Sequence, residues 1–181
     1  MRILATALAL GLFGCAPSVP PRWAQGGAPL VLPTAHWSRG DADAIEIRPN
    51  GEVLEDGSMV WKLDRVGRAV DGDYEAVALL MSDGRVVGTD DRFFGQVGVS
   101  NASPPGSSTA WLSVAPSGEV VYFDRDGTRS SGGRWSGCTG AALRTCTYVT
   151  HLVGLRNYLR SESGPYVGVG VGVGVGVGVG Y

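Results

Sequence analysis

The chain has 181 residues, enough for one domain around a single core, and its formal net charge is −2 at pH 7. Acidic and basic residues are interspersed, and no basic patch marks a nucleic-acid-binding surface. We therefore expect one globular domain and no nucleic acid among its partners.

The chain opens with the parts of a secretory leader. Arg2 is followed by an apolar run of eleven residues, 3–13, and then by Gly14. This run fits the roughly 7–15 residues of a signal-peptide core and is shorter than the roughly 20 residues of a membrane-spanning helix. Residues 1–14 are therefore predicted to be a signal peptide that is removed.

The end of this leader, Leu12-Phe13-Gly14-Cys15, resembles the lipobox of bacterial lipoproteins. The resemblance implies cleavage before Cys15 and transfer of a diacylglycerol to its thiolate, which is the nucleophilic form of cysteine. Two or three acyl chains, palmitate among them, would hold the protein firmly in a membrane. Because Ala16 and not aspartate follows, the resemblance implies the outer membrane of a bacterial envelope. The alternative is an ordinary secretory leader with a chance cysteine.

The segment after the leader differs in texture from the rest of the chain. Residues 15–42 are rich in proline and glycine and have no apolar period, which predicts a lipid-anchored flexible tether. Residues 43–161 show short apolar alternations broken by turn residues, which indicate strands. The polar, proline-containing stretch 101–108 is predicted to be a loop. The expected fold is mainly β, a small antiparallel sandwich or barrel with one C-terminal helix. The predicted strands between the turns include 59–63, 68–70, 76–81, 93–99, 110–114 and 120–123.

Three segments resemble copies of one hairpin, each with an apolar residue, a turn, a charge and a β-branched residue. Their turn glycines stand 33 and 34 residues apart, which indicates a weak internal repeat. Asn-Gly and Asp-Gly pairs favour type I′ turns, because both central positions need a positive φ. The three turns end in Asn50-Gly51, Asp83-Gly84 and Ser117-Gly118.

Aromatic residues of the predicted strands are expected to fill the core. A carbohydrate-stacking aromatic face is the alternative interpretation of these rings. The residues are Trp61, Phe93, Phe94, Trp111, Tyr122, Phe123 and Trp135.

One helix is predicted over residues 151–161, capped by Thr150 and packed on the sheet, because leucines recur at three- and four-residue spacing. Cys138 and Cys146 lie just before it. An even pair of cysteines in an exported protein indicates a disulfide. The alternative is a metal pair, but a zinc site needs four ligands, and neither histidine of the chain shows ligand spacing.

No residues are assigned to catalysis, to a cofactor or to a metal, and we do not expect an enzyme. The Asp124-Arg125-Asp126-Gly127 stretch resembles the start of a calcium loop, but the sixth position lacks the glycine of an EF-hand. The acidic pairs at 71–73 and 90–91 are interpreted in the same way, as turns. Ser136 is off the centre of a Gly-x-Ser-x-Gly motif, and nothing in the sequence places His151 beside it.

Residues 162–181 form a low-complexity tail with seven Val-Gly pairs and a final Tyr181. Three interpretations stay open. The first is a repeat expansion without function. The second is self-association through residues 167–180, since such a strand has no charge and no proline to prevent edge pairing. The third is a membrane-inserted oligomeric strand, because the final aromatic residue resembles the C-terminal signal of outer-membrane barrel strands.

The body of the chain also resembles the uncharacterised exported lipoproteins of GC-rich, myxobacteria-like genomes, through its repeated turn units and the Trp135-Ser136-Gly137-Cys138 stretch. The expected function is that of an outer-membrane-anchored lipoprotein with a non-catalytic binding or scaffolding domain and an unknown envelope partner. The alternative is an oligomerising or membrane-engaging protein that acts through the tail. A hydrolase built from dispersed carboxylates is a third hypothesis.

Overall fold

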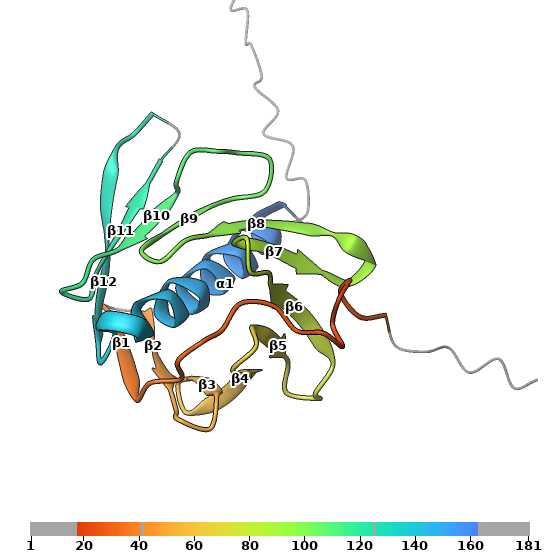
Figure 1. Cartoon of the computed structure of the whole chain (residues 1–181). Helices are drawn as coiled ribbons and strands as arrows, with labels where there is room; N and C mark the ends of the chain where they lie inside the picture. The colour runs from red at the N-terminus through yellow and green to blue at the C-terminus, as the bar shows by residue number, and fades with distance from the viewer. Residues whose placement is uncertain (1–17, 41, 125, 163–181) are drawn as a thin grey trace, which may run out of the picture.

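The computed structural model describes residues 18–40, 42–124 and 126–162. The predicted lipidation site, Cys15, and the Val-Gly tail lie outside the described residues. Twelve antiparallel strands pair in chain order, and β1 closes on β12 to complete a barrel (Figure 1). The prediction of a mainly β fold is therefore confirmed, in its barrel form. Within the described ranges, no helix is both long and apolar enough to cross a membrane.

The strands are short and each pairs with its neighbours in sequence. Their bounds are β1 Ala35–Arg39, β2 Ala42–Ile47, β3 Glu52–Glu55, β4 Ser58–Leu63, β5 Arg68–Val70, β6 Ala76–Leu80, β7 Arg85–Gly88, β8 Phe93–Val97, β9 Asn101–Ser103, β10 Leu112–Val114, β11 Glu119–Phe123 and β12 Arg129–Ser136. Short 3-10 turns, η1 Thr89–Asp91 and η2 Gly140–Ala142, follow β7 and β12. The stretch 101–108, predicted to be a loop, thus begins with β9, which pairs with β8 and β10.

The helix α1, Leu143–Glu162, runs through the middle of the barrel (Figure 1). A barrel of twelve strands is too wide for side chains alone to fill, since about eight strands already suffice to enclose a packed interior. The helix fills this lumen, and nine consecutive residues, 145–153, are buried on all sides. The predicted helix, 151–161, therefore began too late. Thr150 does not cap it, because it lies mid-helix and its hydroxyl donates to the Cys146 carbonyl at 2.7 Å.

The connections between strands lie at the two ends of the barrel. Because successive strands alternate in direction, the connections β1–β2, β3–β4, β5–β6, β7–β8, β9–β10 and β11–β12 share one end, which we name the cavity end. The chain enters α1 from β12 at the opposite end. The helix therefore finishes at the cavity end.

The internal repeat is real but half as long as the sequence indicated. In five hairpins, the backbone carbonyl of one turn residue accepts a hydrogen bond from a backbone N–H of the next hairpin. The accepting residues stand 16 to 18 positions apart in the sequence, so the repeating unit is a single hairpin. The three segments recognised in the sequence are every second copy of this unit. The copies between them lack the polar residue-Gly pair, because Gly67 follows a valine and Ser100 stands in place of the glycine. The five bonds are Leu63 N to Gly51 O at 2.8 Å, Leu80 N to Gly67 O at 2.9 Å, Val97 N to Gly84 O at 2.7 Å, Val114 N to Ser100 O at 2.8 Å and Trp135 N to Gly118 O at 2.8 Å.

The turn type predicted for Asn50-Gly51 and Asp83-Gly84 is wrong. Only the glycine of each pair has a positive φ, and each turn closes with a bond from the glycine N–H to the carbonyl three residues earlier. This pattern is a type I turn followed by a left-handed bulge residue. The type I′ geometry occurs instead in the β3–β4 hairpin, where Asp56 and Gly57 have φ of 48° and 74°.

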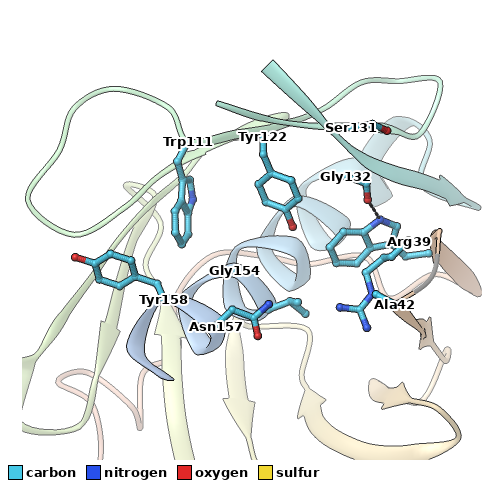
Figure 2. A pocket seen from close by; sticks show the side chains of 11 residues that line it. Arg39, Ala42, Trp111, Tyr122, Ser131, Gly132, Gly154, Asn157 and Tyr158 are labelled. Carbon is cyan, nitrogen blue, oxygen red and sulfur yellow. Dashed lines mark hydrogen bonds between the residues drawn. The ribbon is translucent and has the colours of Figure 1, made fainter. Parts of the chain in front are cut away.

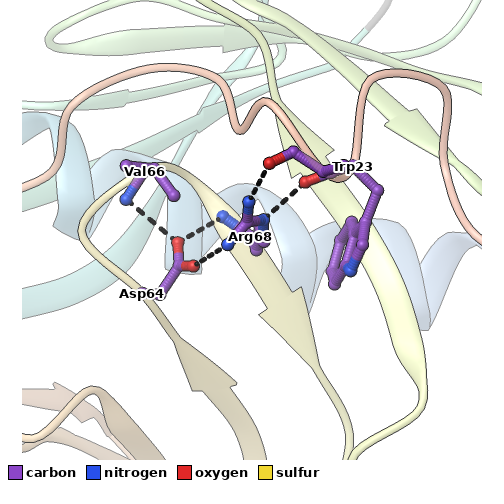
Figure 3. A network of polar contacts seen from close by, with 5 residues as sticks. Trp23, Asp64, Val66 and Arg68 are labelled. Carbon is purple, nitrogen blue, oxygen red and sulfur yellow. Dashed lines mark hydrogen bonds and ion pairs between the residues drawn. The ribbon is translucent and has the colours of Figure 1, made fainter.

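Residues 18–34, which we name the strap, are packed on the barrel. They belong to the segment predicted to be a flexible tether, 15–42, but they lie against the barrel wall. Trp23 covers an apolar cluster on the outer face of β6 and β7. Arg68 donates to the carbonyls of Trp23, at 2.6 Å, and Ala24, at 2.8 Å, and pairs with Asp64 (Figure 3). The strap then leads into β1. The prolines and glycines of this segment therefore belong to an irregular chain that lies on the barrel surface, and not to a flexible linker.

The aromatic core is partly as predicted. Trp61 and Trp135 are buried, while Phe93 is exposed at the outer face. Trp37 lies in the segment predicted to be a tether and was not expected in the core. It is fully buried and stacks on Trp135, with ring centroids 5.3 Å apart. Trp135 also donates through Nε1 to the Thr150 hydroxyl at 2.9 Å, which ties the barrel wall to α1.

Candidate functional site

A cavity of about 480 Å³ lies at the cavity end, between α1 and the strands β1, β2, β11 and β12. In Figure 2, Trp111 and Tyr158 stand on one side and Arg39 on the other, while Tyr122 directs its hydroxyl toward the helix. The volume lies within the roughly 300–1,000 Å³ of small-molecule sites. The lining residues are Trp37, Arg39, Ala42, Trp111, Tyr122, Ser131, Gly132, Val153, Gly154, Asn157 and Tyr158.

The aromatic walls of this cavity are held in place by hydrogen bonds to the barrel and the helix. Trp37 donates through Nε1 to the Gly132 carbonyl at 2.8 Å. Trp111 comes close to α1 because residue 154 is glycine: a Cβ there would lie 3.2 Å from the indole ring. The walls are therefore set before a ligand arrives, which lowers the entropic cost of binding.

His151 fixes Trp111 and is not a free base. Trp111 donates through Nε1 to His151 Nδ1 at 3.2 Å, and His151 Nε2 lies 2.8 Å from the Phe94 carbonyl oxygen, to which it donates. Burial lowers the pKa of His151 to about 4, against the smaller opposing effect of the Phe94 hydrogen bond. At neutral pH the ring is uncharged and both nitrogens are engaged. His151 therefore positions the indole.

Tyr122 offers a neutral hydroxyl to the cavity. Burial raises its pKa to about 12, because the phenolate would lose solvation, and the nearby charge of Arg39 opposes this only in part. The hydroxyl therefore stays protonated across the physiological range. Ser131 and Asn157, both exposed, add further uncharged polar groups to the lining.

Arg39, the one charged group among the described residues that line the cavity, is already paired. Its Nη2 lies 2.8 Å from Glu55 Oε1, and Arg156 Nη2 lies 2.7 Å from Glu55 Oε2. Burial raises the pKa of Glu55, but the bonds and charges of the two arginines outweigh this and leave the pKa below its usual value. Arg39 also lies 5.2 Å above the Trp37 ring centroid. The network therefore braces the cavity wall.

A second hollow of about 510 Å³ adjoins the first and shares Trp111 and Tyr158 with it. The two rings meet edge to face, with centroids 6.3 Å apart and planes at 83°. On its far side lie residues 104–107 of the β9–β10 connection, with Phe123 and Asp124. The aromatic pair thus divides one groove into two compartments.

The residues weighed as metal sites serve as turn residues. Asp126 Oδ1 accepts from the Thr128 N–H at 2.9 Å, and Asp71 Oδ1 accepts from the Asp73 N–H at 3.0 Å. Across the residues that the structure describes, no group of three or more metal-binding side chains gathers. Ser136 donates to the His36 carbonyl at 3.3 Å.

The predicted disulfide between Cys138 and Cys146 is confirmed, with Cα atoms 6.0 Å apart. It joins the chain after β12 to the first turn of α1, not to a loop before the helix. The cavity itself was not predicted. Its walls come from β1, β2, β11, β12 and α1, which lie far apart in sequence. The alternation of buried Ala35 and Trp37 with exposed His36 and Ser38 was the one local signal.

Comparison of the chain with known protein families, with curated proteins and with solved structures finds no match.

Proposed function

We propose that this protein is a lipid-anchored binding protein of the bacterial envelope and that the cavity at the barrel end holds its ligand. The lipobox-like Leu12–Cys15 segment supports the anchor. The Cys138–Cys146 disulfide supports an oxidising compartment outside the cytosol. The observation that carries the binding role is the aromatic cavity, which combines ligand-sized volume with fixed walls and a few polar groups.

The chemistry of the lining favours an uncharged, ring-shaped ligand with hydroxyl or amide groups, of which a sugar unit is the simplest. Aromatic rings offer apolar faces to the C–H face of such a ring, and the groups on Tyr122, Ser131 and Asn157 can bond to its edge. Arg39 is held in the wall by its ion pair with Glu55, and because Glu55 is shared with Arg156 the three groups together keep one net positive charge. The proposal develops the carbohydrate-stacking alternative, of whose seven rings Trp111 and Tyr122 line this cavity.

A binding role is favoured over hydrolysis by the same lining. Among the described residues that form the cavity of about 480 Å³, none is an aspartate or a glutamate, so paired-carboxylate chemistry has no support there. His151 is buried behind Trp111 with both nitrogens engaged. Self-association through the Val-Gly tail remains a separate prediction.

The test is a titration of the mature, lipidated protein in detergent, where no bilayer covers the barrel end, with N-acetylglucosamine oligomers, followed by tryptophan fluorescence. Asn157→Ala removes one amide from the cavity, while Gln96→Ala removes an exposed amide from β8 and is the matched control. Loss of one neutral hydrogen bond of about 0.5–1.5 kcal/mol predicts a Kd raised roughly 2- to 10-fold for Asn157→Ala alone. No binding by the wild type, or equal losses in both variants, would refute the proposal.

A further inference from the structure

We propose that the cavity end of the barrel lies on the membrane, so that the ligand cavity opens toward the bilayer. This rests on the lipid anchor of the proposed function. The occupant of the cavity-end surface is the bilayer itself, and the argument starts from where the strap begins.

The strap first touches the barrel at the cavity end. Ser18 donates through its hydroxyl to Asp90 Oδ1 at 2.7 Å, and Asp90 belongs to η1 in the β7–β8 connection. Pro20 is buried, and Trp23 packs on the outer face of β6 and β7. From there the strap follows the barrel toward the opposite end, where the Ala28 N–H donates to the Leu80 carbonyl at 2.7 Å.

The span between the anchor and this first contact is short. Cys15 precedes Ser18 by three residues. At 3.3–3.6 Å per residue, the backbone can bridge at most roughly 11 Å. The polar headgroup layer of one leaflet is itself about 5–8 Å thick. A lipidated Cys15 therefore brings the β7–β8 connection to the headgroups.

The surface around this contact suits a bilayer interface. Phe93 is 42 % exposed and lies directly opposite Val87 in the β7–β8 ladder, so both share the outer face, where Trp23 packs on the apolar cluster that contains Val87. Tyr74 in the β5–β6 connection is 65 % exposed, and Val19 is 45 % exposed. The exposed large aromatic residues of the described chain, Phe93 and Tyr74, thus both lie at the cavity end. Aromatic residues are favoured at membrane interfaces.

The opposite end also exposes apolar residues, but the anchor does not reach it. Val31, Val66 and Val99 are exposed there, in the strap and in the β4–β5 and β8–β9 connections. The strap runs the length of the barrel between Ser18 and this end. The position of the first strap contact therefore selects the cavity end.

Charge does not drive this docking. The exposed acids Asp90 and Asp91 stand beside the exposed Arg92, and Arg22 is exposed on the strap. Around the strap contact these charges balance, but the exposed acids Asp73 and Glu75 flank Tyr74, so the surface as a whole is acidic. Docking is therefore held by the lipid anchor and the apolar side chains and not by charge attraction.

The experiment uses the full mature, lipidated protein in phosphatidylcholine vesicles. Since Cys15 carries lipid and the other two cysteines form a disulfide, a cysteine introduced on the surface is free for a fluorescent label. Tyr74→Cys and Phe93→Cys place the label at the cavity end, and Val66→Cys and Val99→Cys are the matched controls at the opposite end. Quenching is measured with nitroxide-labelled lipid and with aqueous iodide.

We expect nitroxide lipid to quench the two cavity-end labels at least about threefold more than the controls, and iodide to show the reverse order. Equal quenching at both ends of a lipidated protein would overturn this inference while leaving the ligand cavity untouched. A mature chain without lipid on Cys15 would overturn both the anchor and the docking. Sugar binding is scored separately, by the Asn157→Ala titration.

Discussion

The hairpin glycines provide the sharpest test of the fold, and Gly118→Ala is the best single change. Gly118 has a φ of 86°, and a Cβ added there would lie 1.9 Å from the Trp135 carbonyl oxygen, well inside van der Waals contact. Gly57→Ala is the matched control, because Gly57 has a φ of 74° but nothing within 4 Å of its added Cβ.

The two substitutions share the backbone strain and differ in the clash. A non-glycine residue in the left-handed region costs about 1–2 kcal/mol, which sets the expected loss for Gly57→Ala. Gly118→Ala must also move β12 and weaken the Trp135 N–H to Gly118 O bond of 2.8 Å, for a further 2 kcal/mol or so. We therefore expect a total loss of roughly 3–4 kcal/mol.

The assay is urea unfolding of the two variants, followed by circular dichroism, with thermal midpoints as a second readout. At roughly 2–4 °C per kcal/mol for a domain of this size, Gly118→Ala should lower Tm by about 6–16 °C. If Gly118→Ala costs no more than Gly57→Ala, the close approach between hairpins does not exist, and the hairpin-by-hairpin description of the barrel is incorrect.

Three further predictions concern pH, the core and the tail. Unfolded His151 binds a proton below about pH 6.5, whereas the folded residue, with its pKa lowered to about 4, stays neutral. The stability that His151 contributes is therefore full above pH 6.5 and falls as pH drops toward 4. Urea unfolding should show a loss of roughly 2 kcal/mol between pH 6.5 and 5, and a His151→Gln variant should lack most of that slope. Tyr148→Phe should leave Tm unchanged or raise it slightly, because the buried hydroxyl has no hydrogen-bond partner among the described residues. Deletion of residues 166–181 should leave Tm nearly unchanged and reduce any self-association in analytical ultracentrifugation, since glycine loses most entropy on ordering; a Tm lower by many degrees would make the tail part of the core.

The sequence predicted the strands whose apolar residues alternate clearly and missed those whose composition hid the alternation. Residues 68–70 were predicted with the observed bounds of β5, because they alternate between turn residues. The strand β1 was missed since prolines and glycines precede it, although Ala35 and Trp37 are buried in alternation. Composition describes a segment on average, whereas burial is decided residue by residue.

The first half of α1 was missed for a different reason. Threonines at 145, 147 and 150 lower helix propensity, and a helix buried on all sides has no polar face to reveal its period. Their hydroxyls are satisfied within the structure: Thr147 donates to the Leu143 carbonyl at 2.9 Å, and Thr145 to the Val31 carbonyl at 2.7 Å. The surrounding barrel, which is a property of the whole chain, makes this helix stable.

The most direct test of the central claim compares two tyrosine hydroxyls in the same ligand titration. Tyr122→Phe removes a hydroxyl that faces the cavity, and Tyr148→Phe removes one that is buried in the core away from it. We expect N-acetylglucosamine oligomers to bind the lipidated protein in detergent, with Kd raised roughly 2- to 10-fold by Tyr122→Phe and unchanged by Tyr148→Phe. Unchanged binding in Tyr122→Phe, or no binding by the wild type, would contradict the assignment of the cavity as the ligand site.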